Sequence, residues 1–317
     1  MRKSFFVLAA VACCACSKGV VGSSDVKNEM VELSFRVPVA ASKVSGPVAE
    51  DAVESLQVFV FGEDGQVQSS GVADGNALTL TCSTGEKEIA AVVNASTLEG
   101  INNLSILKAR MADFGDNALG HFVMSGVESK NLEASGSVEI PVSRRVSKVS
   151  LASVTRSFVL EQHKTMDFEL LSVFLTNVPE ETGLFQALQS DALINEGESD
   201  MDVIKASYGD LLFDDLAAVS VAQGETADVG RFLYCYPNVL TDVTRPAYLV
   251  LQTRLGDGVY YYSIELPQME ANKCYNVSLT VTMPGSLTPN VPVSKEDAVF
   301  SVNVADWAGN IDVNETI

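Results

Sequence analysis

Residues 31–39 read VELSFRVPV, and their apolar side chains stand at every second position: Val31, Leu33, Phe35, Val37 and Val39. Alternation with a period of two residues is typical of a strand that buries one face. The next residues, AASKVSGPVAEDA at 40–52, are small, polar and interrupted by Gly-Pro, which predicts a loop. A second strand is expected at 54–62, ESLQVFVFG, followed by an Asp-Gly hairpin turn.

The two-residue pattern recurs along the chain and predicts a mainly β protein. Further strands are expected at 77–82, 88–94, 121–125, 137–142, 146–154, 168–177, 231–236, 248–254, 259–266, 275–283, 299–305 and 311–317. Apolar residues at helical spacing predict short helices at 104–112 and 184–188. Many short strands separated by turns are typical of β-sandwiches, and 317 residues suffice for two domains. We therefore expect two β-sandwich domains in tandem, at 28–158 and 159–317, with the boundary near 155–165.

The composition argues against several classes of function. Asp and Glu number 41 against 21 Lys and Arg, and this acidic balance disfavours nucleic acid and anionic membrane surfaces as partners. The two histidines, His121 and His163, are too few for a three-His zinc site, and neither lies near a nucleophile motif. The densest acidic stretches, 196–202 and 210–215, lack the spacing of an EF-hand loop. We expect no enzyme activity, no catalytic residue, no metal site and no cofactor.

The N-terminal residues 1–16, MRKSFFVLAAVACCAC, read as a secretory signal peptide. A basic start precedes an apolar run that is too short to cross a bilayer. A cysteine after small residues at the end of such a run resembles a bacterial lipobox, so Cys16 is the predicted lipidation site, with Cys14 and Cys13 as alternatives. An ordinary cleaved signal with incidental cysteines is the other interpretation. The remaining cysteines match no metal motif, and their disulfide state is left open: Cys82, Cys235 and Cys274.

Several of these segments, taken in order, resemble the FimA-type fimbrillins of Bacteroidales, the type V pilins. The clearest is 269–307, MEANKCYNVSLTVTMPGSLTPNVPVSKEDAVFSVNVADW. It has an Asn before an aromatic-led strand, a loop rich in Gly, Pro and Asn, and a last strand that ends at Val304-Ala305-Asp306-Trp307. The strand at 53–61, the hairpin at 82–94 and the stretch VSRRVSKV at 142–149 are also similar to this family.

The resemblance implies transthyretin-like domains in a lipoprotein precursor that carries palmitate and is bound to the outer membrane. In such proteins a trypsin-like surface protease cuts the loop after the first strand, and the loss of that strand opens a groove. The C-terminal segment of another subunit then fills the groove. Lys43 occupies the cut position here, which predicts cleavage between Lys43 and Val44. The best-known members have Arg there, so an Arg-specific protease would not serve.

The resemblance also assigns the exchanged strands. The displaced strand would be 31–39, and the donor tail would be 298–317 with its evenly spaced apolar residues: Phe300, Val302, Val304, Ile311, Val313 and Ile317. Alternation alone would make both segments ordinary strands of one monomer. The expected partners are other fimbrial subunits, the protease and the outer membrane, while the adhesion ligand is not identified.

Three other interpretations stay open. An uncut Lys43 would fit an anchor or tip subunit. An exposed strip at Tyr260, Tyr261 and Tyr262 would fit a monomeric glycan-binding lipoprotein, although these side chains also fit a core. An envelope hydrolase would need a convergent His-Ser or paired-carboxylate cleft, and no motif for one is present.

Overall fold

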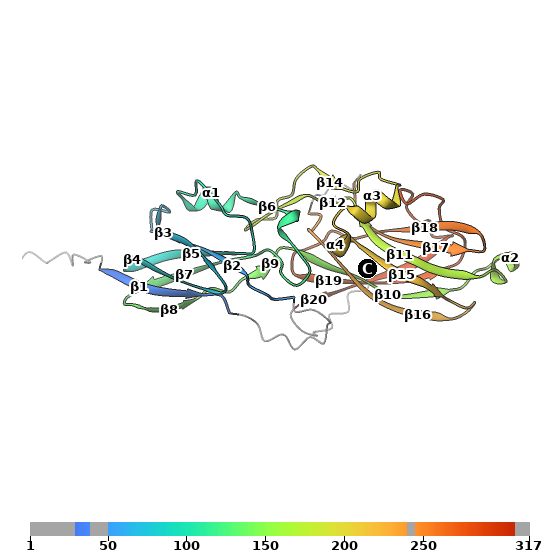
Figure 1. The fold of residues 1–317 in the computed structure, drawn as a ribbon, viewed down its shortest axis with the longest axis horizontal. Helices are drawn as coiled ribbons and strands as arrows, with labels where there is room; N and C mark the ends of the chain where they lie inside the picture. The colour runs from blue at the N-terminus through green and yellow to red at the C-terminus, as the bar shows by residue number, and fades with distance from the viewer. Residues whose placement is uncertain (1–28, 39–49, 240–244, 308–317) are drawn as a thin grey trace, which may run out of the picture.

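The protein is mainly β, and in the computed structural model its sheets form two halves that lie end to end (Figure 1). The structure describes residues 29–38, 50–239 and 245–307. No helix within these ranges is long and apolar enough to cross a membrane.

The N-terminal half contains two facing sheets built from eight strands: β1 (Met30–Arg36), β2 (Ser55–Phe61), β3 (Val67–Asp74), β4 (Ala77–Ser83), β5 (Gly85–Val93), β7 (Met124–Leu132), β8 (Gly136–Glu139) and β9 (Ser143–Arg144). One sheet has the order β3-β2-β5-β7-β9, and the other has the order β4-β1-β8. Buried side chains from both sheets form a single apolar core, as expected of a β-sandwich.

The C-terminal half also contains two sheets of four strands each: β10 (Ser147–Arg156), β11 (Phe168–Thr176), β15 (Phe213–Ser220), β16 (Thr226–Cys235), β17 (Tyr248–Leu255), β18 (Gly258–Glu265), β19 (Lys273–Val281) and β20 (Ala298–Asp306). Their orders are β16-β10-β19-β20 and β15-β11-β17-β18. A large apolar cluster draws buried residues from both sheets. The mainly β, β-sandwich fold with short helices predicted from the sequence is confirmed.

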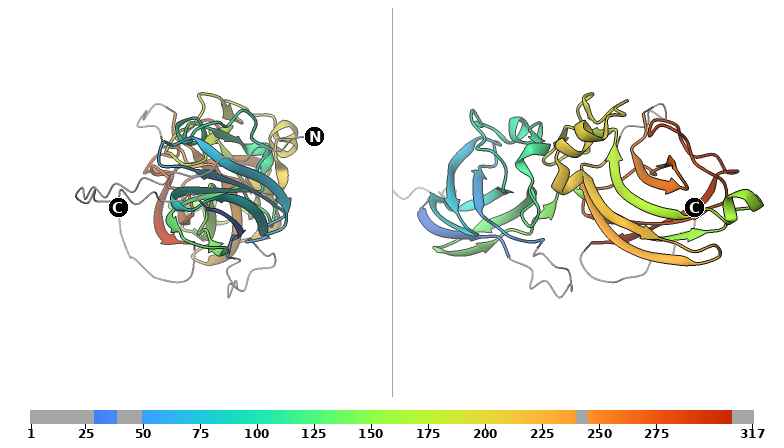
Figure 2. Two further views of the ribbon diagram at one scale, coloured as in Figure 1. Left: turned by 90° about the vertical axis from the view of Figure 1, so that its left-hand side faces the viewer. Right: turned by 45° about the vertical axis from the view of Figure 1, so that its right-hand side comes forward.

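Short elements connect the strands: α1 (Leu104–Lys108), β6 (Met111–Asp113), η1 (Phe114–Asp116), α2 (Glu161–Lys164), β12 (Val178–Pro179), β13 (Glu181–Gly183), β14 (Leu193–Ile194), α3 (Met201–Ala206) and α4 (Gly209–Leu212). Several of them lie near the junction of the halves (Figure 2), whereas α2 lies at the far end of the C-terminal half (Figure 1). β6 pairs with β13, so one backbone ladder joins the two halves. Phe114 and Phe122 belong to the apolar cluster of the C-terminal half, which extends the core across the junction.

Some predicted elements differ from the observed ones. The helix expected at 184–188 is absent, because Leu184 donates its backbone N–H to the carbonyl of Arg110, next to the β6–β13 ladder. The helix expected at 104–112 ends at Lys108, since residues 111–113 form β6. The strand expected at 121–125 begins only at Met124, because His121 pairs with Ala118 in an isolated bridge.

The strand pairing moves the expected boundary between the halves. The sequence prediction placed residues 146–154 in the N-terminal domain, whereas β10 pairs with β16 and β19. β9 still pairs with β7, so the chain changes sheets between Arg144 and Ser147 rather than at 155–165. The reason is that two-residue alternation indicates which face of a strand is buried but does not identify the strand that pairs with it.

Candidate functional site

The first strand, β1, lies in the middle of its sheet rather than at an edge. It pairs with β4 in antiparallel fashion from Met30↔Ser83 to Arg36↔Ala77. It pairs with β8 in parallel fashion from Leu33↔Gly136 to Arg36↔Glu139. Loss of β1 would therefore leave unpaired backbone donors and acceptors on both neighbours, and such edges template pairing with another strand.

The apolar face of β1 is part of the N-terminal core. Val31, Leu33 and Phe35 of β1, and Val37 directly after it, are at most 6% exposed and pack among residues of β2, β5 and β7. Burying one such side chain stabilises a fold by about 1.5–3 kcal/mol, so the four together contribute on the order of 6–12 kcal/mol as an upper limit. Val39, the fifth residue of the predicted strand face, lies outside the described residues.

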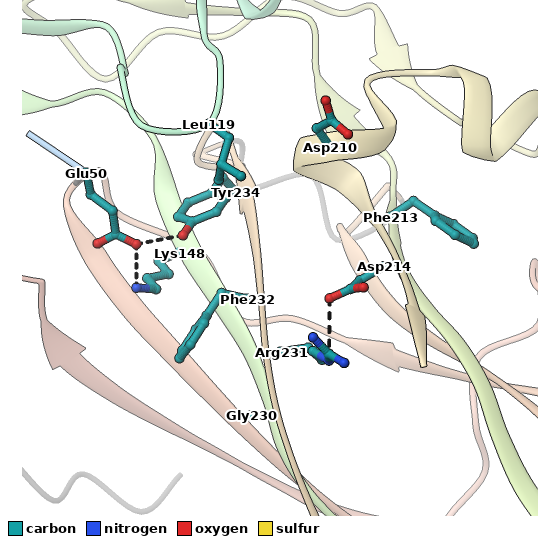
Figure 3. Close-up of a pocket in the computed structure, with 10 residues that line it drawn as sticks. All are labelled: Glu50, Leu119, Lys148, Asp210, Phe213, Asp214, Gly230, Arg231, Phe232 and Tyr234. Carbon is teal, nitrogen blue, oxygen red and sulfur yellow. Dashed lines mark hydrogen bonds and ion pairs between the residues drawn. The ribbon is translucent and has the colours of Figure 1, made fainter. Parts of the chain in front are cut away.

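The predicted cut site, Lys43 and Val44, also lies outside the described residues, as do the candidate lipidation sites Cys16, Cys14 and Cys13. The chain is described again from Glu50, where it enters a network of buried polar side chains. Lys148 donates from Nζ to Glu50 Oε1 at 2.7 Å, and the Tyr234 hydroxyl donates to the same oxygen at 2.6 Å (Figure 3). Trp307 donates from Nε1 to Glu50 Oε2 at 2.8 Å.

A second acid–base pair lies beside the first. Arg144 forms an ion pair with Asp51, donates from its Nε to the carbonyl of Glu50 at 3.2 Å, and donates from its Nη1 to Asn272 Oδ1 at 2.9 Å. Its guanidinium lies 4.6 Å from the centre of the Trp307 ring. Arg144 is 9% exposed, so this network sits in a largely dehydrated environment where paired charges interact strongly.

The network keeps Glu50 ionised. Burial by itself raises the pKa of Glu50, but the hydrogen bonds from Lys148, Tyr234 and Trp307 outweigh it and hold the pKa below its usual value. Burial, together with the hydrogen bond to Glu50, raises the pKa of Tyr234, which therefore stays a neutral donor. Sequence reasoning missed this network, because its members are far apart in the chain and match no motif.

A pocket of about 400 Å³ opens next to the network (Figure 3). Glu50, Lys148 and Tyr234 line one part, and Asp214 with Arg231 lines another. Arg231 Nε is 3.7 Å from Asp214 Oδ2, so the charges of this pocket already pair with one another. Within the part of the chain that the structure describes, no group of three His, Cys, Asp or Glu side chains could hold a metal ion.

The predicted donor segment begins as an edge strand of its own chain. β20 pairs with β19 from Val281↔Ala298 to Lys273↔Asp306, and Trp307, which is 5% exposed, follows its last residue. Val302 and Val304 pack against the core, whereas Phe300 is 39% exposed. The other predicted donor residues, Ile311, Val313 and Ile317, lie outside the described residues.

The remaining candidates are structural. Tyr262 is buried and donates from its hydroxyl to the carbonyl of Met283 at 2.8 Å, so this member of the tyrosine strip is a core residue. Cys82 and Cys235 are buried, Cys274 is half-buried, and all three are free thiols. Burial raises the pKa of Cys235 to about 12 and that of Cys274 to about 11, which disfavours the reactive thiolate.

Comparison with known proteins agrees with this geometry. A family model described as major fimbrial subunit protein (FimA) matches residues 32–156, from β1 to the end of β10. A fimbrilin (FimA) from Porphyromonas gingivalis W83 has a similar fold, with a TM-score of 0.60 and 15% identity over 88% of this chain and 98% of that one. No curated protein matches the chain.

Two further solved structures cover the same extent. A candidate cell adhesion protein from Bacteroides eggerthii has a TM-score of 0.64 and 18% identity over 88% of this chain and 97% of that one. Another, from Parabacteroides distasonis, has a TM-score of 0.65 and 15% identity over 88% and 99%. At these identities the likeness concerns the fold. Together with the family match, it confirms the resemblance to FimA-type fimbrillins that the sequence predicted.

Proposed function

We propose that this protein is a fimbrial structural subunit that is activated by proteolytic loss of its first strand and polymerises by donor-strand exchange, supporting cell adhesion. The observation that carries the proposal is the central position of β1 between β4 and β8, with its apolar face in the core. An extended segment of another chain would restore both backbone ladders and refill the apolar trough.

The burial of β1 has a kinetic consequence for this mechanism. Cutting the loop after β1 breaks only the covalent link, while the buried side chains and two backbone ladders still hold the strand. We infer that the cut strand leaves when an incoming strand replaces its contacts. Exchange in this way links one subunit to the next head to tail, and such heterologous contacts extend into a filament.

We place the exchange in the tail beyond Trp307. The predicted donors Phe300, Val302 and Val304 lie in β20, so donating them would require unpairing a nine-residue strand from β19. Ile311, Val313 and Ile317 follow Trp307 in the sequence, at intervals of two and four residues, and lie beyond β20. The proposal also includes a tandem division into two domains and an outer-membrane precursor lipidated at Cys16.

Trypsin treatment of the purified protein tests this function. We expect a new N-terminus at Val44, followed by filaments in electron micrographs whose amount rises with protein concentration. Lys43→Gln should keep the fold by far-UV circular dichroism but give no filaments. Lys295→Gln, which changes an exposed lysine in a C-terminal loop, is the matched control and should polymerise normally.

Each alternative predicts a different result. Filaments from uncut Lys43→Gln would contradict processing at Lys43. A protein that is cut at Lys43 but stays monomeric at all concentrations would contradict polymerisation, and it would favour an anchor, a tip subunit or a monomeric binding protein.

A further inference from the structure

Glu50 lies where segments from distant parts of the chain meet. It begins the described chain after the predicted cut loop, and its carboxylate binds Lys148 of β10, Tyr234 of β16 and Trp307 at the end of β20. Glu50 and Trp307 are 257 positions apart in the sequence. This contact therefore joins the segment downstream of the cut to the base of the C-terminal tail.

We propose that this network is a clasp that stays closed after processing and fixes the point from which the donor tail leaves the subunit. We call it the Glu50 clasp, and its members are Glu50, Asp51, Arg144, Lys148, Tyr234 and Trp307. The inference rests on the proposed function, because it concerns the positioning of the tail in that same exchange.

The sequence positions show why the clasp would survive the cut. Glu50 and Asp51 follow Lys43 in the chain, so cleavage between Lys43 and Val44 leaves both acids in the mature protein. None of the six clasp residues belongs to β1. Departure of β1 therefore removes no member of the clasp.

Trp307 is held on several sides. Its ring stacks on Tyr234 with centroids 5.7 Å apart, contacts Phe122 edge-on at 5.8 Å and lies under the Arg144 guanidinium. Replacing the Glu50 carboxylate would leave the indole N–H and the Lys148 ammonium without this partner in a buried site, which is costly. The carboxylate is thus the group that closes the clasp.

A fixed base defines the reach of the tail. A fully extended chain spans at most about 3.5 Å per residue, so the position of Trp307 limits how far each later residue can reach. Since Glu50 binds Trp307 directly, the point where the described chain resumes after the predicted cut lies beside the residue that follows β20. A loose base would spread the tail over many directions and lower its effective concentration at a neighbouring groove.

Fluorescence tests the clasp directly, because Trp307 is the single tryptophan of the protein. We expect blue-shifted emission and slow acrylamide quenching in the wild-type protein, unchanged after trypsin. Glu50→Ala should shift the emission to the red and raise the quenching rate constant several-fold. Glu50→Gln, which keeps the side-chain size, should give an intermediate increase. Glu169→Gln removes an ion pair with Arg254 on the other sheet and should leave Trp307 unchanged.

The outcomes separate the clasp from the proposed function. Equal quenching in wild type, Glu50→Ala and Glu50→Gln would overturn the clasp, as would loss of Trp307 protection when the wild type is cut. Far-UV circular dichroism of each variant shows that the comparison is made on folded protein. A wild type that is cut but forms no filaments would contradict the proposed function, while the fluorescence comparison would still decide the clasp.

Discussion

At the scale of single residues, Glu50 is an acid that its neighbours keep charged inside the protein. The titratable and charged groups that face it are Lys148, Arg144, Tyr234, Cys274 and the adjacent Asp51. Burial raises the pKa values of Tyr234 and Cys274, so both groups stay neutral as the solution is acidified. We therefore expect acid to act on the clasp through the Glu50 carboxylate.

This arrangement predicts the sign of a pH effect. The pKa of Glu50 is lowered from 4.5 in the folded protein, so its stabilising contribution is complete above about pH 4.5 and is lost as the pH falls through the folded value. We expect Trp307 emission to shift to the red below about pH 4.5. Glu50→Gln should flatten this transition. The same titration of Asp51→Asn measures whether Asp51 also contributes to the shift in Trp307 emission. A transition of the same size in Glu50→Gln would contradict the assignment.

At the scale of elements, β1 belongs to the precursor but not to the proposed mature subunit. Phe35 is fully buried, and truncating a buried Phe costs about 3–5 kcal/mol. We expect Phe35→Ala to lower the free energy of unfolding of the precursor by that amount. After the cut and the exchange of β1, Phe35→Ala and wild-type subunits are the same molecule and should unfold alike.

A matched variant on a retained strand gives the control. Ile89 of β5 is equally buried in the same core, and Ile89→Ala should cost about 2–5 kcal/mol in both the precursor and the assembled form. Chemical denaturation of the four samples measures these values. If Phe35→Ala destabilises the assembled subunits as much as it destabilises the precursor, then β1 is not lost during assembly.

The elements also show what the sequence could predict. The alternating pattern correctly predicted β1 and β20, because each strand packs one face against a core. It did not predict that Phe300 is partly exposed on the edge strand β20. It missed β15, where Ala217 and Ala218 have positive φ angles and interrupt the strand pattern. The clasp was unpredictable from sequence spacing, since Glu50 and Trp307 meet only through the packing of both halves.

At the scale of the whole molecule, the two halves share a core and a polar contact. The Tyr236 hydroxyl, from the C-terminal half, donates to the carbonyl of Asp113 at 2.9 Å and accepts from Asn117 Nδ2 at 2.9 Å. Its ring meets Phe114 edge-on at 5.2 Å. Together with the β6–β13 ladder, these contacts raise the free energy of unfolding one half alone, because its unfolding would expose the junction surface of the half that stays folded.

We therefore expect one cooperative unfolding transition for the whole precursor. Tyr236→Phe should keep the transition single but lower the free energy of unfolding by about 1–3 kcal/mol, because the buried Asn117 amide and the Asp113 carbonyl each lose a hydrogen-bond partner. Denaturant titrations followed by Trp307 fluorescence and by far-UV circular dichroism should coincide for both proteins. Two separate transitions in the wild type would contradict the shared junction. They would also imply that a subunit can open one sandwich for exchange while the other stays folded.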